Sequence, residues 1–398
     1  MSASERTTVL HVRIVSGTGG GPEKTILNSP RHLEGTPYRA LAAYLHAPGD
    51  VGIEVLRARA AERSCPFFAF EDALPVDPRT LQALAELCRR ENVRIWHGHD
   101  YKSNLYGLLL ARLVDVKLAT TVHGWVKHTE KTPLYFAIDR WCLRRYEAVV
   151  AVSRDLYDEC ARLGVPRERL TQIDNAIDTT EFRRTRPARE SALRTDSQAE
   201  APPREASPGE SSAGRAQRER LVIGAVGRLS PEKGFTFLIE AVERLVARGR
   251  DVELWIAGEG EDQAELAARM QRSPARERLR LLGFQKDTIA LFEAFDVFAL
   301  SSLREGLPNV VLEAMAMGVP LVATRCGGME AFGRDGLDML LVDKGSVEAL
   351  ERGLERLIAD AGLRAHLASA ARARIERELS FTRRMQRMIA VYDELLSR

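Results

Sequence analysis

Several features that would assign the chain to a specialised class are missing. Its five cysteines are scattered, odd in number and without any Cys-x-x-Cys pair, which argues against a disulfide framework or a zinc site and favours free thiols in a reducing compartment. No apolar run approaches the roughly 18 residues that a membrane-spanning helix needs. Residues 1–8 are polar, so we expect no secretory signal. These absences predict a cytoplasmic protein.

Two nucleotide-binding fingerprints and one metal motif are also missing. The loop over residues 17–22 has Pro22 where a dinucleotide fingerprint needs its last glycine, and Glu23 stands where a P-loop needs glycine before its lysine. No Asp-x-Asp occurs that would hold a diphosphate through a metal ion, so we predict no metal. The formal net charge of +2 leaves no overall electrostatic footprint for nucleic acid, and we expect no such partner.

What is present is a regular alternation of strand and helix patterns over 398 residues, enough chain for two domains. The predicted strands lie at 9–15, 38–45, 66–70, 93–96, 118–122, 148–152 and 170–173 in the first half, and at 221–226, 252–257, 279–282, 296–300, 319–324 and 339–342 in the second. Helical patterns separate them, for example at 77–90, 102–113, 235–248, 261–271, 347–360 and 363–378. This alternation predicts parallel sheets covered on both faces, and so an α/β fold with two doubly wound domains.

One segment interrupts the alternation. Residues 183–220 are rich in Arg, Glu, Ser, Ala and Pro and have almost no large apolar side chain, so they cannot bury enough surface to become ordered. We predict a first domain at 1–182, a disordered linker at 183–220 and a second domain at 221–378. An amphipathic helix within 379–398 is expected to cross back to the first domain.

The most informative stretch runs from Ser302 to Gly318. It lies between two apolar strand patterns and should begin a helix near Pro308 or Asn309, because proline suits a first helical turn. Gly318 then falls where a left-handed C-cap belongs. The helix is apolar nearly all round and should be buried, which makes its single carboxylate, Glu313, costly unless a group such as a ligand hydroxyl pair donates to it.

Other groups with reactive or binding chemistry also follow strands. Glu305 comes just past a strand, where open α/β sheets bind ligands, and the backbone N–H groups of 306–310 suit a phosphate. The loop from Gly227 to Gly234 contains Arg228 and Lys233, two cations that would stabilise charge growing on a leaving diphosphate. The alternative for this loop is an exposed basic turn.

Two strands end in histidines. His123 follows the strand at 118–122, and His97-Gly98-His99-Asp100 ends the strand before it. The second group is incomplete as a metal site and is better interpreted as lining a pocket. For His123 the alternative is an ordinary polar loop residue.

These motifs resemble those of the large retaining nucleotide-sugar glycosyltransferase family called group 1, or family four. The resemblance rests on Glu305 and Glu313 with seven residues between them, on Gly-Leu-Pro-Asn and Glu-Ala-Met-Ala-x-Gly-x-Pro around them, and on Gly-Arg-Leu-x-x-x-Lys-Gly in the basic loop. It covers nearly the whole chain except the linker. It implies a GT-B fold, two Rossmann-like domains facing across a cleft, with the donor on the C-terminal side and the acceptor on the N-terminal side.

The resemblance also implies roles for individual residues. His123 and Glu305 would contact the donor sugar, Arg228 and Lys233 would bind its phosphates, and Glu313 would hold the ribose. The remaining donor-binding residues would be Gly20, Gly258, Phe284, Gly306, Leu307, Pro308, Asn309 and Val310. The predicted activity is metal-independent transfer of a sugar from a nucleoside diphosphate sugar to an acceptor hydroxyl with retention of configuration, without a further cofactor.

The base, the sugar and the acceptor are not specified by the sequence. A glycan or a lipid-linked sugar is the acceptor that the family favours, and the basic aromatic stretch from Arg140 to Tyr146 suggests peripheral contact with the inner face of the membrane. Two other functions remain open: a sugar-nucleotide epimerase, and a non-catalytic nucleotide-sugar-binding protein on the same fold. Product formation would distinguish them.

Overall fold

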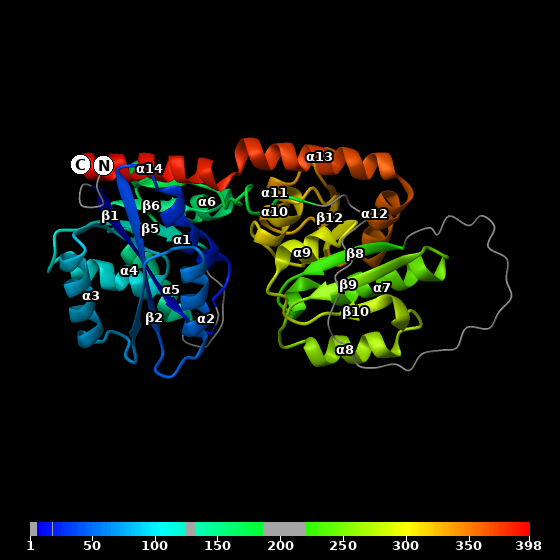
Figure 1. The fold of residues 1–398 in the computed structure, drawn as a ribbon, viewed down its shortest axis with the longest axis horizontal. Coiled ribbons are helices and arrows are strands. Elements are labelled where there is room, and N and C mark those ends of the chain that lie inside the picture. The colour runs from blue at the N-terminus through cyan, green and yellow to red at the C-terminus, as the bar shows by residue number, and fades with distance from the viewer. Residues whose placement is uncertain (1–5, 18, 125–131, 186–219) are drawn as a thin grey trace. The chain divides into compact units, whose positions relative to one another are not determined.

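The computed structural model describes residues 6–17, 19–124, 132–185 and 220–398. The chain divides into two compact units, one made of residues 1–176 with 379–398 and the other of residues 177–378. Each unit contains one sheet of parallel strands, as the alternating pattern predicts (Figure 1). Most of the predicted linker, residues 186–219, lies outside the described residues.

Unit 1 is built on a seven-stranded sheet with the order β3-β2-β1-β4-β5-β6-β7. Its strands are β1 (Thr7–Val15), β2 (Tyr38–His46), β3 (Phe67–Glu71), β4 (Val93–Gly98), β5 (Lys117–Val122), β6 (Ala148–Ala151) and β7 (Leu170–Gln172). Its helices are α1 (Gly21–His32), α2 (Gly52–Glu62), α3 (Pro78–Arg90), α4 (Tyr101–Leu110), α5 (Thr132–Leu143), α6 (Arg154–Arg162) and α14 (Phe381–Ser397).

Both faces of the unit 1 sheet are covered, which explains why its strands are nearly continuous apolar runs. In β1, Leu10 packs into the core on one face and Val9 into the core on the other. The second face is closed by α14, drawn in red in Figure 1. Its buried side chains recur on one stripe of the helix: Phe381, Met385, Met388, Tyr392 and Leu395. Each such side chain stabilises the unit by about 1.5–3 kcal/mol, so the end of the chain is part of the core of unit 1.

Unit 2 has a six-stranded sheet with the order β10-β9-β8-β11-β12-β13. Its strands are β8 (Leu221–Val226), β9 (Val252–Ala257), β10 (Leu279–Leu281), β11 (Val297–Leu300), β12 (Leu321–Thr324) and β13 (Leu340–Val342). Its α-helices are α7 (Phe235–Ala247), α8 (Gln263–Arg272), α9 (Thr288–Glu293), α10 (Asn309–Ala316), α11 (Gly328–Phe332), α12 (Val347–Ala359) and α13 (Ala361–Glu378).

Three predicted boundaries differ from the structure for identifiable reasons. The helix predicted at 102–113 ends at Leu110, because the chain turns there and Leu113 N–H bonds to the carbonyl of Leu110. The strand predicted at 319–324 begins at Leu321, since Pro320 has no N–H to pair. The predicted domain boundary at 182 lies inside unit 2.

The segment just after Ala176 belongs to unit 2 because α13 holds it. Arg372 on α13 donates to the carbonyl oxygens of Phe182 and of Thr179, at 2.6 Å and 3.1 Å. Phe182 is itself buried, with 5% of its surface exposed. Arg184 continues the attachment by donating to the carbonyl of Glu293 at 2.9 Å.

Candidate active site

The carboxyl ends of β8 and β11 meet at the topological switch point of unit 2. The two strands are neighbours, and the chain leaves them toward opposite edges of the sheet, to β9 and to β12. In open α/β sheets this is the position where ligands bind. The basic loop after β8 and the glutamate loop after β11 therefore lie side by side, as both sequence motifs require.

The two loops are fixed to each other by hydrogen bonds to backbone carbonyl oxygens. Ser301 donates from its hydroxyl to the carbonyl of Lys233 at 2.9 Å, and Leu303 N–H donates to the carbonyl of Glu232 at 2.7 Å. Gly234 makes this approach feasible: its φ is +62°, and a Cβ there would lie 2.4 Å from the Ser301 carbonyl oxygen. Any other residue would be both strained and in collision.

Lys233 and Glu305 form an ion pair where the loops meet. Lys233 Nζ contacts Glu305 Oε1, and the Ser302 hydroxyl donates to the same oxygen at 2.9 Å. Their side chains are 19% and 12% exposed, so water screens the pair only partly. The structure thus brings two of the predicted catalytic residues together, although 72 positions separate them in the chain.

Arg228, the other predicted cation, is exposed in the same loop. The charge of Arg228 acts on the carboxylate of Glu232 in this loop. Partial burial raises the pKa of Glu232, but its backbone hydrogen bond and the charges of Arg228 and Lys233 lower the pKa more. The charges of both cations therefore act on the same carboxylate in this loop, and the role of Arg228 at the phosphates stays a prediction.

The helix that follows, α10, begins at Asn309 with Pro308 as its N-cap, and Gly318 has a φ of +63° just past its end. Both features were predicted from the sequence. Glu313 lies on this helix with 0% of its surface exposed, whereas Gly306 is exposed. Leu307, Pro308, Asn309 and Val310 are half-buried around the start of the helix.

Gly258 and Phe284 follow β9 and β10 on the same edge of the sheet. Gly258 N–H donates to the carbonyl of Gly283 at 2.8 Å, and a Cβ at Gly258 would lie 1.8 Å from the Gly227 carbonyl oxygen. The loops after β8, β9 and β10 are therefore in direct contact. The Phe284 ring is 53% exposed, as expected of a side chain available to a flat ligand.

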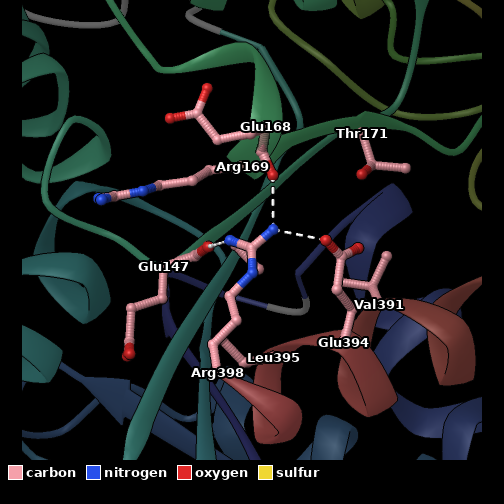
Figure 2. A pocket seen from close by; sticks show the side chains of 9 residues that line it. Glu147, Glu168, Arg169, Thr171, Val391, Glu394, Leu395 and Arg398 are labelled. Atoms are coloured by element: carbon pink, nitrogen blue, oxygen red, sulfur yellow. Dashed lines mark hydrogen bonds and ion pairs between the residues drawn. The ribbon is translucent and has the colours of Figure 1, made fainter.

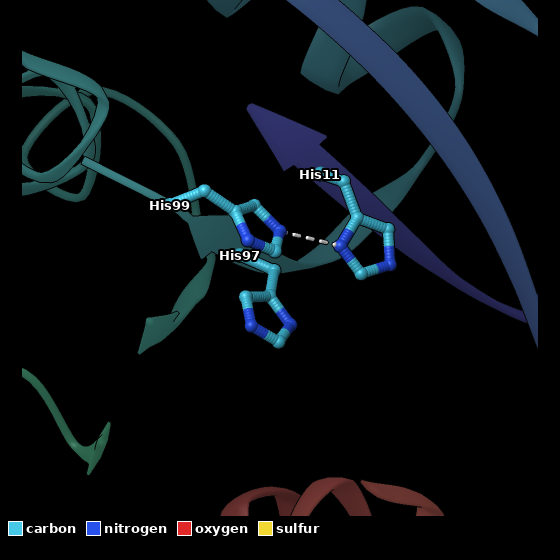
Figure 3. Close-up of side chains that lie close together, drawn as sticks. All are labelled: His11, His97 and His99. Atoms are coloured by element: carbon cyan, nitrogen blue, oxygen red, sulfur yellow. Dashed lines mark hydrogen bonds between the residues drawn. The ribbon is translucent and has the colours of Figure 1, made fainter. Parts of the chain in front are cut away.

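Unit 1 has a corresponding edge, where four histidines gather. His99 Nε2 lies 2.9 Å from His11 Nδ1, and His99 Nδ1 lies 3.0 Å from His123 Nε2. Figure 3 shows the rings of His99 and His11 turned toward each other, with His97 beside them. The rings of His97 and His99 are stacked, 4.7 Å apart and inclined by 4°.

These histidines are neutral. Burial, aided by the charge of Arg384, lowers the pKa of His11 to about 3. Burial is also the main cause that lowers the pKa of His97, of His99 and of His123 well below the usual value. Desolvation disfavours the charged imidazolium, so the edge of unit 1 offers neutral hydrogen-bonding groups.

Three of the rings, those of His11, His97 and His99, place ligand nitrogens within 4.8 Å of one another. His97, however, uses both nitrogens already: Nδ1 lies 2.7 Å from the Tyr392 hydroxyl and Nε2 lies 2.7 Å from the Thr121 hydroxyl. A metal would have to displace these bonds. The absence of a metal from the chemistry remains a prediction.

Gly20, predicted to contact the donor, precedes α1. Its N–H donates to Glu23 Oε2 at 2.5 Å, and the other oxygen of Glu23 pairs with Arg13 Nε at 2.6 Å. This amide is therefore bonded within the protein, and the role of Gly20 in donor binding stays a prediction.

Three contributors to these edges were not found from the sequence. His11 had a signal, a polar residue between Leu10 and Val12 in a largely apolar strand. Arg384 had none, because nothing in its helix pattern indicates contact with a distant strand. Ser302 lay within the quoted motif but was not assigned a role.

A small cavity at the end of α14 is unrelated to these edges. It is lined by Glu147, Ala148, Glu168, Arg169, Thr171, Val391, Glu394, Leu395 and Arg398. Figure 2 shows the Arg398 guanidinium directed to the Glu168 carbonyl, at 2.7 Å, and to the Glu394 carboxylate, at 2.5 Å. Its volume of about 10 Å³ suits one water molecule, so it is a helix-docking contact.

The two parallel-sheet units and their polar edges define a protein with two Rossmann-like domains of the GT-B class. Residues 19–181 match the family model Glycosyltransferase Family 4, and residues 220–360 match the model Glycosyl transferases group 1. The chain therefore belongs to the group 1 and family 4 glycosyltransferases.

Individual relatives agree with this assignment. The lipopolysaccharide core biosynthesis glycosyltransferase LpsE of Rhizobium meliloti (strain 1021) is 42% identical over 147 residues, which span 37% of this chain and 42% of that protein. An Escherichia coli UDP-Gal:alpha-D-GlcNAc-diphosphoundecaprenol alpha-1,3-galactosyltransferase is 25% identical over 301 residues, 71% of each chain. HepE of Anabaena, in a crystal structure with UDP and glucose, superposes with a TM-score of 0.79 at 21% identity, covering 98% of this chain and 100% of that one.

Proposed function

We propose that the protein transfers a sugar from a nucleoside diphosphate sugar to an acceptor hydroxyl, with retention of configuration and without a metal. The observation that carries this proposal is the Lys233–Glu305 pair at the switch point of unit 2, between a loop with a second cation and a helix with a buried glutamate. Such a donor has a group for each of these side chains: phosphates for the two cations, sugar hydroxyls for Glu305 and ribose hydroxyls for Glu313. Crystals of HepE with UDP and glucose support the choice of donor class.

The ion pair gives a sequence of events for donor binding. Lys233 lies against Glu305, so a donor diphosphate must compete with the carboxylate for the ammonium. Once the phosphates hold Lys233, Glu305 is free to accept hydrogen bonds from the sugar hydroxyls. The pair thus couples phosphate recognition to sugar recognition.

Departure of the nucleoside diphosphate then develops negative charge at the same place. Lys233 and Arg228 are positioned to stabilise it, together with the backbone N–H groups at the start of α10. Glu313, buried on α10, is the acceptor for the ribose hydroxyls. The leaving diphosphate itself takes the proton of the acceptor hydroxyl, since no other base is required.

For the acceptor we favour a glycan or a lipid-linked sugar, because LpsE is named for lipopolysaccharide core biosynthesis and the Escherichia coli galactosyltransferase for a GlcNAc-diphosphoundecaprenol. On α5, Leu134 and Trp141 are 59% and 47% exposed, and the Arg145 guanidinium lies 3.9 Å from the Trp141 ring centroid. These residues are the candidate contact with a membrane surface. Tyr146, predicted as part of this surface, is fully buried and bonds to the carbonyl of Asn104 instead. Within the described residues, no helix has the length and hydropathy to cross a bilayer.

The deciding experiment incubates the protein with a panel of nucleoside diphosphate sugars, with and without glycan and lipid-linked acceptors. Released nucleotide and the anomeric proton of the product are measured by NMR. We expect an acceptor-dependent product with the donor's configuration, unchanged by EDTA. An epimerised donor without acceptor would favour the epimerase alternative, and binding without turnover would favour the non-catalytic one. Activity lost with EDTA and restored by magnesium would reject the metal-free mechanism.

A further inference from the structure

We propose that His11 and His99 are positioning residues that fix the tautomer of His123, so that His123 presents Nδ1–H as a hydrogen-bond donor. The three rings form an unbroken chain from the middle of β1, past the end of β4, to the end of β5. Its two links are 2.9 Å and 3.0 Å long. The value of this arrangement for sugar binding rests on the proposed function.

The chain has only two arrangements of its protons. A neutral imidazole has one N–H donor and one acceptor nitrogen, and the low pKa of each ring keeps all three neutral. Each link needs one proton, so donors must follow one another in the same direction. The third proton then resides at one end, on His11 Nε2 or on His123 Nδ1.

The two ends of the chain differ in burial more than in the charges around them. Near His11 is Arg384, a buried cation on α14 whose Nη1 donates to the carbonyl oxygens of Ile173 and Asp174. Among the described residues no carboxylate is hydrogen-bonded to it. Near His123 is Arg13 on β1, which pairs with Glu23 at 2.6 Å, and the charge of Arg384 acts on His123 as well.

The burial of the two end nitrogens selects one arrangement. His11 Nε2 is buried without a hydrogen-bond partner among the described residues, and a buried N–H without an acceptor is costly, so this atom carries the lone pair. His123 is only partly buried, so a proton on its Nδ1 can be satisfied by water. His11 then donates from Nδ1 to His99, and His99 donates from Nδ1 to His123 Nε2. The remaining proton of His123 is placed on Nδ1, an atom with no hydrogen bond in the described part of the chain.

His97 keeps the middle ring in place. It stacks on His99 and is itself held by Thr121 and by Tyr392 on α14. The C-terminal helix therefore contributes to the geometry at His123 through Tyr392. A sugar oxygen facing His123 would meet a donor of fixed direction, with no cost of proton rearrangement.

The test is long-range ¹H–¹⁵N correlation NMR on the full chain labelled with ¹⁵N-histidine, which distinguishes Nδ1–H from Nε2–H rings. The eight histidines are assigned by single His→Gln variants. At pH 7.5 we expect His11, His99 and His123 as Nδ1–H tautomers. An Nε2–H or doubly protonated His123 would overturn the proposal.

Variants of the middle ring sharpen the test. His99→Leu should release His123 to a mixture of tautomers, whereas His99→Gln should preserve Nδ1–H, because the glutamine amide can accept from His11 and donate to His123. His46→Gln, outside the chain, is the matched control. An unchanged His123 in His99→Leu would contradict the inference, and should that variant not fold, His11→Leu gives the same comparison.

Kinetics then separates the inference from the proposed function. We expect His99→Leu to lower kcat by about tenfold, the equivalent of one ordinary hydrogen bond, with His99→Gln restoring most of it. If the wild type turns over no donor, the proposed function is rejected. The NMR result then still decides whether His11 and His99 fix the tautomer of His123. Nδ1–H tautomers without any kinetic effect would reject the positioning role, and ring signals that change with EDTA in a zinc-containing sample would show a metal site instead.

Discussion

The two polar edges have the same topological position in their sheets but opposite electrostatics. The edge of unit 2 concentrates formal charge, with the Lys233–Glu305 pair and Arg228 around loops that touch through glycines. The edge of unit 1 concentrates neutral rings, buried so that they resist protonation. Both lie at a switch point, β8/β11 in one unit and β1/β4 in the other.

This difference suits two kinds of recognition. A diphosphate is a multiply charged group whose leaving step needs fixed cations, and those must remain partly accessible to exchange partners. Sugar hydroxyls are neutral and are recognised by directional donors and acceptors, for which a fixed tautomer is sufficient. The fold provides the positions, and the surroundings of each edge decide which chemistry it supports.

Removing the central cation should produce the largest effect. Lys233→Ala is expected to lower kcat by about a hundredfold, roughly 3 kcal/mol of transition-state stabilisation, with a smaller loss of nucleoside diphosphate affinity because Arg228 and the start of α10 remain. Steady-state kinetics and calorimetry measure both. Arg304→Ala, an exposed cation in the neighbouring loop, is the control, and near-normal turnover of Lys233→Ala would show that the diphosphate binds elsewhere.

Loop contact in unit 2 can be tested at Gly234. Gly234→Ala should lower the free energy of unfolding by roughly 2–3 kcal/mol, because it adds a collision with Ser301 to the strain of a left-handed residue. Gly249→Ala, at φ +81° with nothing within 4 Å, has only the strain and should cost about 1 kcal/mol. Chemical denaturation compares them. Equal losses would mean that the loops can separate freely.

The neutral edge predicts a pH dependence of stability. The folded pKa of His11 is lowered to about 3, so between pH 6.5 and 3 the unfolded chain binds more protons and stability falls as pH falls. At pH 5 this one ring should cost about 2 kcal/mol relative to pH 8. His11→Asn should remove that part of the slope in denaturation curves from pH 8 to 5, while His46→Gln should not. If stability changes with pH by the same amount in both variants, the His11 ring is solvated and its pKa is not lowered by folding.

The smallest expected effect tests the competition between carboxylate and phosphate. Glu305→Gln leaves Lys233 without its anionic partner, so nucleoside diphosphate affinity should rise by about three- to tenfold, on the order of 1 kcal/mol for a partly exposed pair, even as turnover falls. Calorimetry measures the affinity, with Glu330→Gln, exposed on α11, as the control. Weaker binding would mean that Glu305 orders the loop and does not compete for Lys233.

Much of unit 2 could be predicted because its signals are local. The strands at Leu221–Val226 and Val252–Ala257 are apolar runs with clear ends, and their predicted bounds are confirmed. Pro308 and Gly318 mark the ends of α10 by backbone geometry alone. Lys233 and Glu305 were each placed in a loop after a strand, but their ion pair was not predicted and depends on which strands are neighbours in the sheet.

Unit 1 was less accessible to such reasoning. The sequence showed that His97, His99 and His123 end strands, but their hydrogen bonds depend on the register between β1, β4 and β5. His11 faces His97 because these residues are Cα partners across β1 and β4, a relation that no local pattern encodes. The buried state of Tyr146 was missed for the same reason, since its partner Asn104 lies on α4, far away in the sequence.

The sequence by itself determined the element order, the two-domain α/β class and the family, because strand and helix periods, caps and loop motifs are short-range properties of the chain. The sequence also predicted that a helix within 379–398 returns to the first domain, which is confirmed. Only the tertiary structure decided that this helix places Tyr392 against His97 and brings the charge of Arg384 to the histidines. It also decided the protonation of those rings. The burial of each ring and the charges around it depend on residues from distant parts of the chain, so they are set only when the chain has folded.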